Sequence, residues 1–323
     1  MMPIRAPLRI VIPGGSGQVG TLLAQHFHAR GDEVTVLSRH PKPTPWKTIH
    51  WDACTLDKWT QSLEGADVVI NLAGRSVNCR YNLLNQQLIR HSRVLTTQLL
   101  GEVIANLERP PKLWMNASTA TIYRHALDRA MDEETGELGG NEKDLPAKWN
   151  FTTDVAKEWE EALHAAPTPF TRKIALRNAI IMSASRGGPF DILLKLVRLG
   201  LGGRSGSGNQ YISWVHETDY IRAVDFLIEH EEFDGHVNIA APNPLPNWEF
   251  MRDLRSAWGI GFGLPAAGWM LTLGALLMRT ETQHILRSHR VIPGRLLAAG
   301  FQFQFPSWPE AVRDLVTRFR KLT

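Results

Sequence analysis

The sequence predicts an α/β protein with a Rossmann-like, doubly wound parallel sheet and a smaller, mostly helical C-terminal lobe. Three observations support this. Short apolar runs alternate with longer amphipathic ones in the first half, a glycine-rich turn follows the first apolar run, and short helical segments follow a proline-rich entry at 242–246. A chain of 323 residues is long enough for one large domain or two smaller ones.

The expected elements follow in order. Strands are predicted at residues 8–12, 33–38, 49–52, 68–72, 112–117, 172–181 and 211–215. Helices are predicted at residues 19–29, 82–107, 151–165 and 218–230. The acidic, glycine-containing stretch 126–146 is expected to be a surface loop beside a site. We therefore assign residues 1–177 to a dinucleotide-binding domain to which 211–240 return, and residues 178–210 and 241–323 to a substrate-side lobe.

Composition and charge exclude several classes of protein. An apolar share of 43% argues against disordered and fibrous chains, and a net charge of +4 does not favour nucleic-acid binding. Cys54 and Cys79 are too few for a disulfide framework or a metal site, and they suit a reducing compartment. The apolar run at 8–12 is too short for a signal peptide. These observations favour a cytoplasmic protein.

Residues 259–278 carry no charged side chain, which approaches the roughly 20 residues that a membrane span needs. Gly259, Gly261, Gly263 and Pro265 interrupt this stretch and leave about 14 residues, the length of an ordinary globular helix. We expect a buried or surface helix rather than a span. Contact of residues 265–278 with a membrane surface is the weaker alternative.

The turn after the first strand has the spacing of a phosphate-binding loop. Its residues are Gly14, Gly15, Ser16, Gly17, Gln18, Val19 and Gly20. The first glycine of such a turn permits the tight bend, the middle one lets backbone N–H groups approach a pyrophosphate, and the last lets the helix pack on the strand. Because this turn lies between a predicted strand and a predicted helix, we expect it to bind a dinucleotide.

The second strand ends in Ser38, Arg39 and His40. NAD-preferring sites have a carboxylate here to accept hydrogen bonds from the ribose. A guanidinium and a hydroxyl suit a 2′-phosphate instead. The sequence therefore favours NADP(H), and the alternative is that Arg39 is a solvated loop residue.

Three segments resemble extended short-chain dehydrogenase/reductases: the glycine turn, Asn71-Leu72-Ala73-Gly74, and residues 118–123 (STATIY). Residues 202–216 and the tail RVIPGRLL at 290–297 with Gly300-Phe301 resemble the epimerase-like family that carries a C-terminal domain of unknown function. The resemblance spans nearly the whole chain. It implies that Asp52 and Ala53 lie near the adenine of the cofactor. It also implies that Leu72, Ala73 and Gly74 line the middle of the cofactor, and that Ala117 and Ser118 flank the nicotinamide ribose. In related enzymes, helices resembling those from Asn82 and Phe151 form a dimer contact, so a homodimer is a further expectation.

The chemistry of these reductases uses a Tyr whose pKa is lowered by a Lys four residues later, with a Ser or Thr hydroxyl holding the substrate oxygen. Thr119 matches the hydroxyl and Lys157 matches the lysine, but Thr153 stands where the Tyr is expected. A threonine hydroxyl is far too weak an acid to replace a phenol. Tyr123 is the nearest other candidate acid in the sequence. It could instead be a core-packing residue.

The glycine- and serine-rich segment 202–208 is expected to be a substrate-side loop, whose backbone could bind an anion. Candidate substrate contacts are Arg204, Gln210, Tyr211, Trp214 and His216. His125, Tyr211 and His216 are further candidates for a proton donor, while His216 could equally be structural.

Two functions remain open from the sequence. The first is an NADP(H)-dependent, epimerase-like oxidoreductase acting on a small, nucleotide-sugar-like substrate. The second is a non-catalytic NADP(H)-binding regulator or interaction protein, which the missing Tyr favours.

Overall fold

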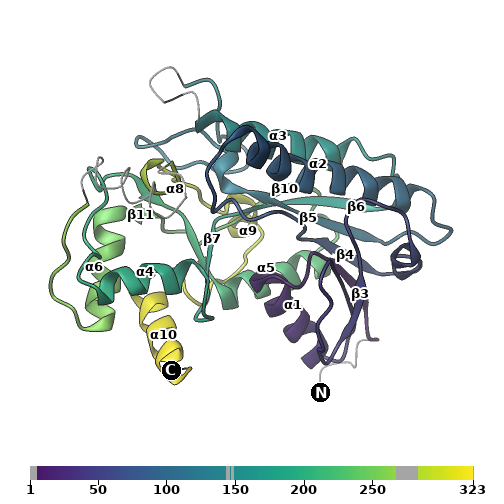
Figure 1. The fold of residues 1–323 in the computed structure, drawn as a ribbon, viewed down its shortest axis with the longest axis horizontal. Coiled ribbons are helices and arrows are strands. Elements are labelled where there is room, and N and C mark those ends of the chain that lie inside the picture. The colour runs from purple at the N-terminus through teal and green to yellow at the C-terminus, as the bar shows by residue number, and fades with distance from the viewer. Residues whose placement is uncertain (1–5, 143–145, 147–148, 267–282, 323) are drawn as a thin grey trace.

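The computed structural model describes residues 6–142, 146, 149–266 and 283–322. Its centre is a parallel seven-stranded sheet in the order β10-β6-β5-β4-β1-β2-β3 (Figure 1). The strands are β1 (Arg9–Pro13), β2 (Glu33–Ser38), β3 (Lys47–His50), β4 (Val68–Asn71), β5 (Leu113–Thr119), β6 (Arg172–Asn178) and β10 (Gly235–Ile239). Six of them follow the doubly wound order of dinucleotide-binding sheets. The predicted Rossmann-like fold is confirmed.

Helices cover both faces of the sheet because alternate strand residues point to opposite sides. Ile10 and Ile12 pack with α1 (Gln18–Ala29) and α5 (Glu217–Glu229), while Val11 belongs to the core beneath α2 (Leu83–Ala105) and α3 (Asn150–His164). Figure 1 shows α2 and α3 side by side on one face and α1 with α5 on the other. The short 3-10 helices η1 (Lys58–Ser62) and η2 (Ala120–Ile122) complete this half.

A second core lies beside the sheet. Its elements are α4 (Pro189–Arg198), β7 (Ile180–Met182), β8 (Tyr211–Ile212), β9 (Trp214–His216), β11 (Leu245–Pro246), α6 (Asn247–Trp258) and α10 (Trp308–Lys321). The short helix α8 (Gln283–Leu286) precedes α9 (Gly294–Ala298), whose buried Leu296 packs in the main core instead. At its centre, the Trp308 ring lies 5.0 Å from that of Trp214 and stacks on Phe250 at 3.9 Å. The C-terminal helix α10 therefore contributes Trp308 to the centre of this second core.

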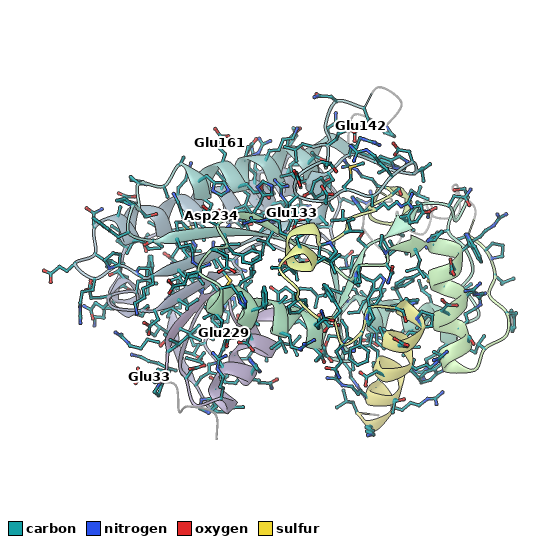
Figure 2. The ribbon with its side chains drawn as sticks, turned by 180° about the vertical axis from the view of Figure 1, so that it is seen from behind. Glu33, Glu133, Glu142, Glu161, Glu229 and Asp234 are labelled. Atoms are coloured by element: carbon teal, nitrogen blue, oxygen red, sulfur yellow. The ribbon has the colours of Figure 1, made fainter. Side chains whose placement is uncertain are left out.

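Glu133 connects the C-terminal segment to the sheet. Its carboxylate accepts hydrogen bonds from the backbone N–H of Asn238 in β10 and of Arg295 in α9, at 2.8 and 3.2 Å. Figure 2 shows Glu133 beside this yellow segment, in the middle of the molecule. Burial raises the pKa of Glu133, although both backbone donors oppose the shift. The loop that contains Glu133 is thus fixed between two distant parts of the chain.

Several elements differ from the sequence prediction. The single strand expected at 211–215 is wrong, because it is divided into β8, which pairs with β11, and β9, which pairs with β7. The single strand expected at 172–181 is wrong, because the chain leaves the main sheet at Ala179 and β7 pairs with β9 instead. The helix α4 was not predicted, although Pro189 and Asp191 in its first turn are start signals. The strand β10, GHVNI, was not predicted because it is short and contains two polar residues.

In the described part of the chain, no helix is long and apolar enough to cross a membrane. Most of the helix expected within residues 259–278 lies outside the described residues. At the start of that stretch, Gly259 caps the C-terminus of α6, and its φ of 93° is left-handed and suits glycine.

Candidate cofactor and active site

The glycine turn connects β1 to α1 and packs against the end of β4. A Cβ on Gly14 would lie 2.6 Å from the Cα of Ala73, and a Cβ on Gly20 would lie 2.4 Å from the Cα of Gly15. The backbone N–H of Gly14 donates to the carbonyl of Leu37 in β2 at 2.9 Å. Gly14 and Gly20 are therefore required by the packing of the protein itself.

Gly17 differs from these two glycines. A Cβ at this position would meet only the carbonyl oxygen of Gly14, at 3.9 Å. Gly17 is the N-cap of α1, and neither a capping side chain nor an acidic residue occupies the first turn of this helix. The free N–H groups and the positive end of the helix dipole suit an anion here.

The end of β2 adds polar groups beside this turn. The buried Ser38 donates from Oγ to Ser16 Oγ at 2.9 Å and accepts from the backbone N–H of His40 at 3.2 Å. Arg39 and His40 are exposed, and the Arg39 guanidinium has no hydrogen-bond or ion-pair partner among the residues that the structure describes. Arg39 is thus available to an anionic ligand.

Asp52, expected near the adenine, follows β3 and fixes a local turn. Its carboxylate accepts hydrogen bonds from the backbone and side chain of Thr55 and from the backbone of Cys54, which lower the pKa of Asp52 to about 2. Ala53 beside it has a positive φ of 66°. The Asp52 carboxylate therefore remains charged and shapes this turn.

The ends of β4 and β5 lie next to the glycine turn. The buried Asn71 donates to Asn116 Oδ1 at 2.6 Å and accepts from the N–H of Ala73 at 3.1 Å, while Leu72 N–H donates to the carbonyl of Pro13. Because β1, β4 and β5 are neighbours, the structure brings the turn, residues 72–74 and residues 117–118 to one carboxyl edge. Ligands of open α/β sheets bind at this edge.

Thr153 and Lys157 lie on α3, close to η2. Thr153 is fully buried, and its hydroxyl donates to the carbonyl of Thr121 at 3.2 Å. Lys157 Nζ donates to the carbonyl of Gly139 at 2.6 Å. Thr119, at the end of β5, accepts from the N–H of Thr121 at 3.2 Å. The expected hydroxyl and lysine are thus brought to the same region of the fold.

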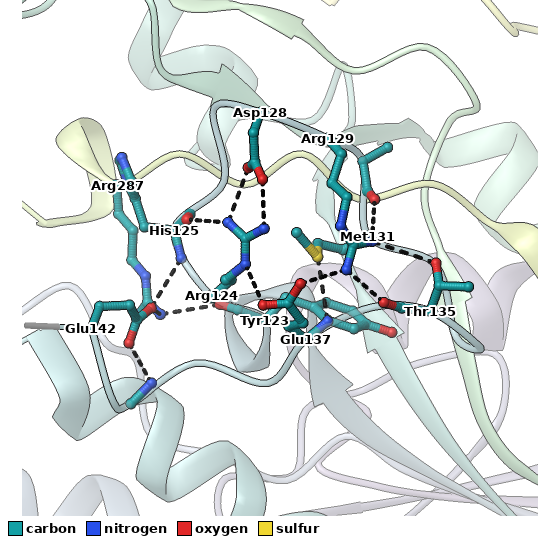
Figure 3. Close-up of polar contacts among 12 residues, drawn as sticks. Tyr123, Arg124, His125, Asp128, Arg129, Met131, Thr135, Glu137, Glu142 and Arg287 are labelled. Carbon is teal, nitrogen blue, oxygen red and sulfur yellow. Dashed lines mark hydrogen bonds and ion pairs between the residues drawn. The ribbon is translucent and has the colours of Figure 1, made fainter.

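No local sequence pattern indicates that Arg287 belongs to this region. Its guanidinium donates to Thr153 Oγ1 at 2.8 Å, and Figure 3 shows it beside Glu142 and Tyr123. It also contacts the Trp149 carbonyl, the Tyr123 carbonyl and Glu142 Oε1, at 3.2, 3.1 and 3.3 Å. Arg287 is only 4% exposed, and burial lowers its pKa although Glu142 opposes the shift. An arginine from the C-terminal segment therefore contacts Thr153, the residue at which the family resemblance leads us to expect the tyrosine.

The loop at 124–142 is fixed by ion pairs and hydrogen bonds. Arg124 binds both Asp128 and Glu137, and Glu137 also binds Arg129 (Figure 3). Met131 of the loop is fully buried and forms a bridge with Val291. The expected surface loop is therefore anchored, and it carries Gly139, the partner of Lys157.

Tyr123 lies in a buried polar chain. Its hydroxyl accepts from Arg177 Nη1 at 2.8 Å and donates to Asn238 Oδ1 at 3.0 Å. Arg177 forms a two-point ion pair with Glu160, which accepts from Ser118 Oγ at 2.6 Å. Burial raises the pKa of Tyr123, although Arg177 opposes the shift. A raised pKa is the reverse of what a phenol acting as an acid near neutral pH needs.

The expected substrate-side residues occupy different environments. Trp214 and His216 are fully buried, and His216 binds the Thr218 N–H and Asp314. Their burial places both side chains in the core, not on a surface that closes over a ligand. Gln210 is buried too, and its amide donates to the carbonyls of Ser205 and Ile285. Of the other two candidates, Tyr211 is half-buried with Arg290 over its ring at 4.3 Å, and Arg204 is exposed.

Comparison with known proteins agrees with this architecture. Residues 10–143 match the NAD dependent epimerase/dehydratase family, and residues 266–315 match a domain of unknown function, DUF1731. The human epimerase family protein SDR39U1 is 32% identical over 312 residues, covering 96% of this chain and all of the relative. The chain belongs to the epimerase family. An epimerase family protein of Staphylococcus aureus is 30% identical, with 95% of this chain and 99% of the relative covered.

Solved structures of family members have the same fold. The crystal structure of human SDR39U1 with NADPH matches with a TM-score of 0.83 and 31% identity over 96% of this chain and 99% of that one. A nucleoside-diphosphate sugar epimerase from Corynebacterium glutamicum matches with a TM-score of 0.75 and 27% identity, covering 96% of this chain and 58% of that one. These epimerase family structures therefore include one that was crystallised with NADPH.

Proposed function

We propose that this protein binds NADP(H) at the carboxyl edge of its sheet. The observation that carries the proposal is the open space over Gly17, together with the exposed Arg39, which has no partner among the described residues and follows Ser38, the partner of Ser16 in the turn. The first suits a pyrophosphate at the start of α1, and the second suits the 2′-phosphate that distinguishes NADP(H) from NAD(H). NADPH in the crystal structure of the human relative supports the same assignment.

We propose further that the protein is an epimerase-like oxidoreductase acting on a small substrate such as a nucleotide sugar. Bound nicotinamide would supply hydride transfer. Thr119 would hold the substrate oxygen through its hydroxyl, and Ser118 would flank the nicotinamide ribose. Lys157 would contribute a positive charge near this centre while its ammonium remains bound to Gly139.

A specific observation favours a second candidate, an NADP(H)-binding regulator without turnover. The position of the reductase tyrosine holds Thr153, which is fully buried and bound to Arg287. Neither group is a proton donor suited to neutral pH, because a threonine hydroxyl is too weak an acid and a guanidinium stays protonated. The proton relay of ordinary carbonyl reduction is therefore missing at this position.

The test separates binding from turnover. NADPH should raise the thermal midpoint of the purified protein more than NADH at equal concentration. NADPH oxidation is then measured against aldehydes, ketones and nucleotide sugars, together with interconversion of the sugars. Binding with turnover supports the oxidoreductase, binding without turnover across the panel supports the regulator, and equal midpoints with and without NADPH would refute both.

A further inference from the structure

Four large apolar side chains are exposed on two neighbouring loops at the far end of the C-terminal lobe. Leu199 and Leu201 follow α4 and are 72% and 48% exposed, while Phe262 and Leu264 follow α6 and are 67% and 57% exposed. In Figure 1 the chain after α6 forms the outer edge of the molecule, away from the sheet. We call these four residues the apolar edge. Soluble proteins rarely gather such side chains without a partner.

Backbone hydrogen bonds hold the two loops together. The N–H of Leu264 donates to the carbonyl of Gly200 at 2.8 Å, and the N–H of Gly203 donates to the carbonyl of Leu264 at 3.2 Å. The Phe262 ring lies close enough to Gly200 that a Cβ there would touch it at 3.4 Å. The apolar edge is therefore a built surface, whose side chains are kept outward by a paired backbone.

The charges around this surface are positive. Arg198 and Arg204 are exposed, and neither has a carboxylate partner among the described residues. Arg198 lies over the ring of Trp258, at 5.5 Å from its centroid. The acids of the neighbouring α6, Glu249 and Asp253, are both bound by Arg252. The apolar edge thus has two cations beside it that a partner can neutralise.

We infer that the apolar edge binds the headgroup region of an anionic lipid bilayer. Leucine and phenylalanine side chains beside arginines are the composition that inserts shallowly at a membrane surface, with acyl chains meeting the apolar groups and lipid phosphates meeting the cations. Such contact requires no membrane-spanning helix. It would bring an NADP(H)-binding site to a membrane surface, and it stands whether or not the protein turns over a substrate.

The experiment is flotation of the full-length protein with vesicles. The vesicles are phosphatidylcholine alone, or phosphatidylcholine containing phosphatidylglycerol, at low and high sodium chloride. The test variant is Phe262→Glu/Leu264→Glu. Its matched control is Phe170→Glu/Leu56→Glu, because Phe170 and Leu56, at 83% and 62%, are more exposed than Phe262 and Leu264 but lie in the dinucleotide-binding half. Thermal unfolding of each variant verifies that it is folded.

We expect the unmodified protein and the control to float with anionic vesicles, less so at high salt, and the test variant to remain in the soluble fraction. Arg198→Gln should weaken binding to anionic vesicles about fivefold and leave binding to neutral vesicles unchanged. Failure of the unmodified protein to float with anionic vesicles would overturn the proposal. Equal flotation of a folded test variant would also overturn it. The proposal is also overturned if light scattering shows that the unmodified protein is an oligomer and the test variant is not, while neither binds vesicles. The apolar edge would then join copies of this chain.

Discussion

Arg287 Nη1 donates to Thr153 Oγ1 across 2.8 Å, although the two residues are 134 positions apart. The bond connects the C-terminal segment to the helix that carries Lys157. Both residues are buried, so a larger side chain at residue 153 would meet the Arg287 guanidinium. Restoring a tyrosine there must therefore involve both residues.

We predict that Thr153→Tyr alone destabilises the protein, by roughly 1 to 3 kcal/mol, because the added ring overpacks a fully buried position. Thr153→Tyr/Arg287→Ala should make room for a phenol one helical turn from Lys157, but it removes the donor to the Trp149 and Tyr123 carbonyls and should not be more stable than the single variant. Urea unfolding measures the stability of each variant, and NADPH oxidation on the substrate panel measures its activity. Strong turnover by the unmodified protein that survives Lys157→Met would contradict the role assigned to Lys157. Tyr211 and His125 would then be the candidates for the proton donor.

We expect NADPH to bind more tightly than NADH, because only NADPH presents a 2′-phosphate to Arg39. Calorimetric titration of both cofactors measures the difference. Arg39→Ala should cost NADPH roughly 1.5 to 3 kcal/mol, the value of a hydrogen bond to a charged group, and leave NADH nearly unchanged. Equal affinities in the unmodified protein would refute the preference.

Gly17→Val should abolish NADPH binding without destabilising the fold, whereas Gly20→Val should destabilise the fold. A side chain at residue 17 enters open space, so the protein should fold normally and fail to bind NADPH. A side chain at residue 20 would collide with the backbone of Gly15 and should lower the free energy of unfolding. Thermal melts with and without NADPH distinguish the two. A ligand-induced shift that persists in Gly17→Val would contradict the assigned turn.

His216 should make stability depend on pH. Burial lowers its pKa in the folded state, although Asp314 opposes the shift. Below the unfolded value of about 6.5, the unfolded chain then takes up a proton that the folded protein does not, so stability falls as the solution is acidified. His216→Asn should flatten this dependence by up to about 1.4 kcal/mol per pH unit. Urea midpoints between about pH 7 and pH 5 provide the measurement, and an unchanged slope would contradict it.

Local signals explain what the sequence predicted correctly. The strand β2 was predicted at its observed bounds because the apolar residues Val34, Val36 and Leu37 alternate with polar ones between Gly31 and Arg39. The glycine turn was recognisable because its strand, turn and helix are consecutive. Residues whose contacts are local along the chain can be assigned in this way.

The remainder depends on contacts between distant residues. The strand β6 ends at Asn178 because the chain then pairs through β7 with β9, more than thirty residues later, which no local pattern indicates. The burial of Trp214 follows from Trp308 and Phe250, and the partners of Arg287 lie in three earlier segments. From the sequence alone, an isolated arginine such as Arg287 is expected to be exposed to solvent. Its hydrogen-bond acceptors come from distant segments and become apparent only in the folded structure.

The buried chain of polar groups that starts at Ser118 does not stop at Asn238. The Asn238 side-chain amide donates to the carbonyl of Ile292, inside the segment that matches the domain of unknown function. Separating that segment would leave Asn238 and Glu133 buried without these partners, which is costly. The two regions recognised by family models are therefore not interchangeable modules. We expect them to melt as one cooperative unit, and a chimera that exchanges only the C-terminal segment between relatives would also need the carbonyl and N–H partners of Asn238 and Glu133.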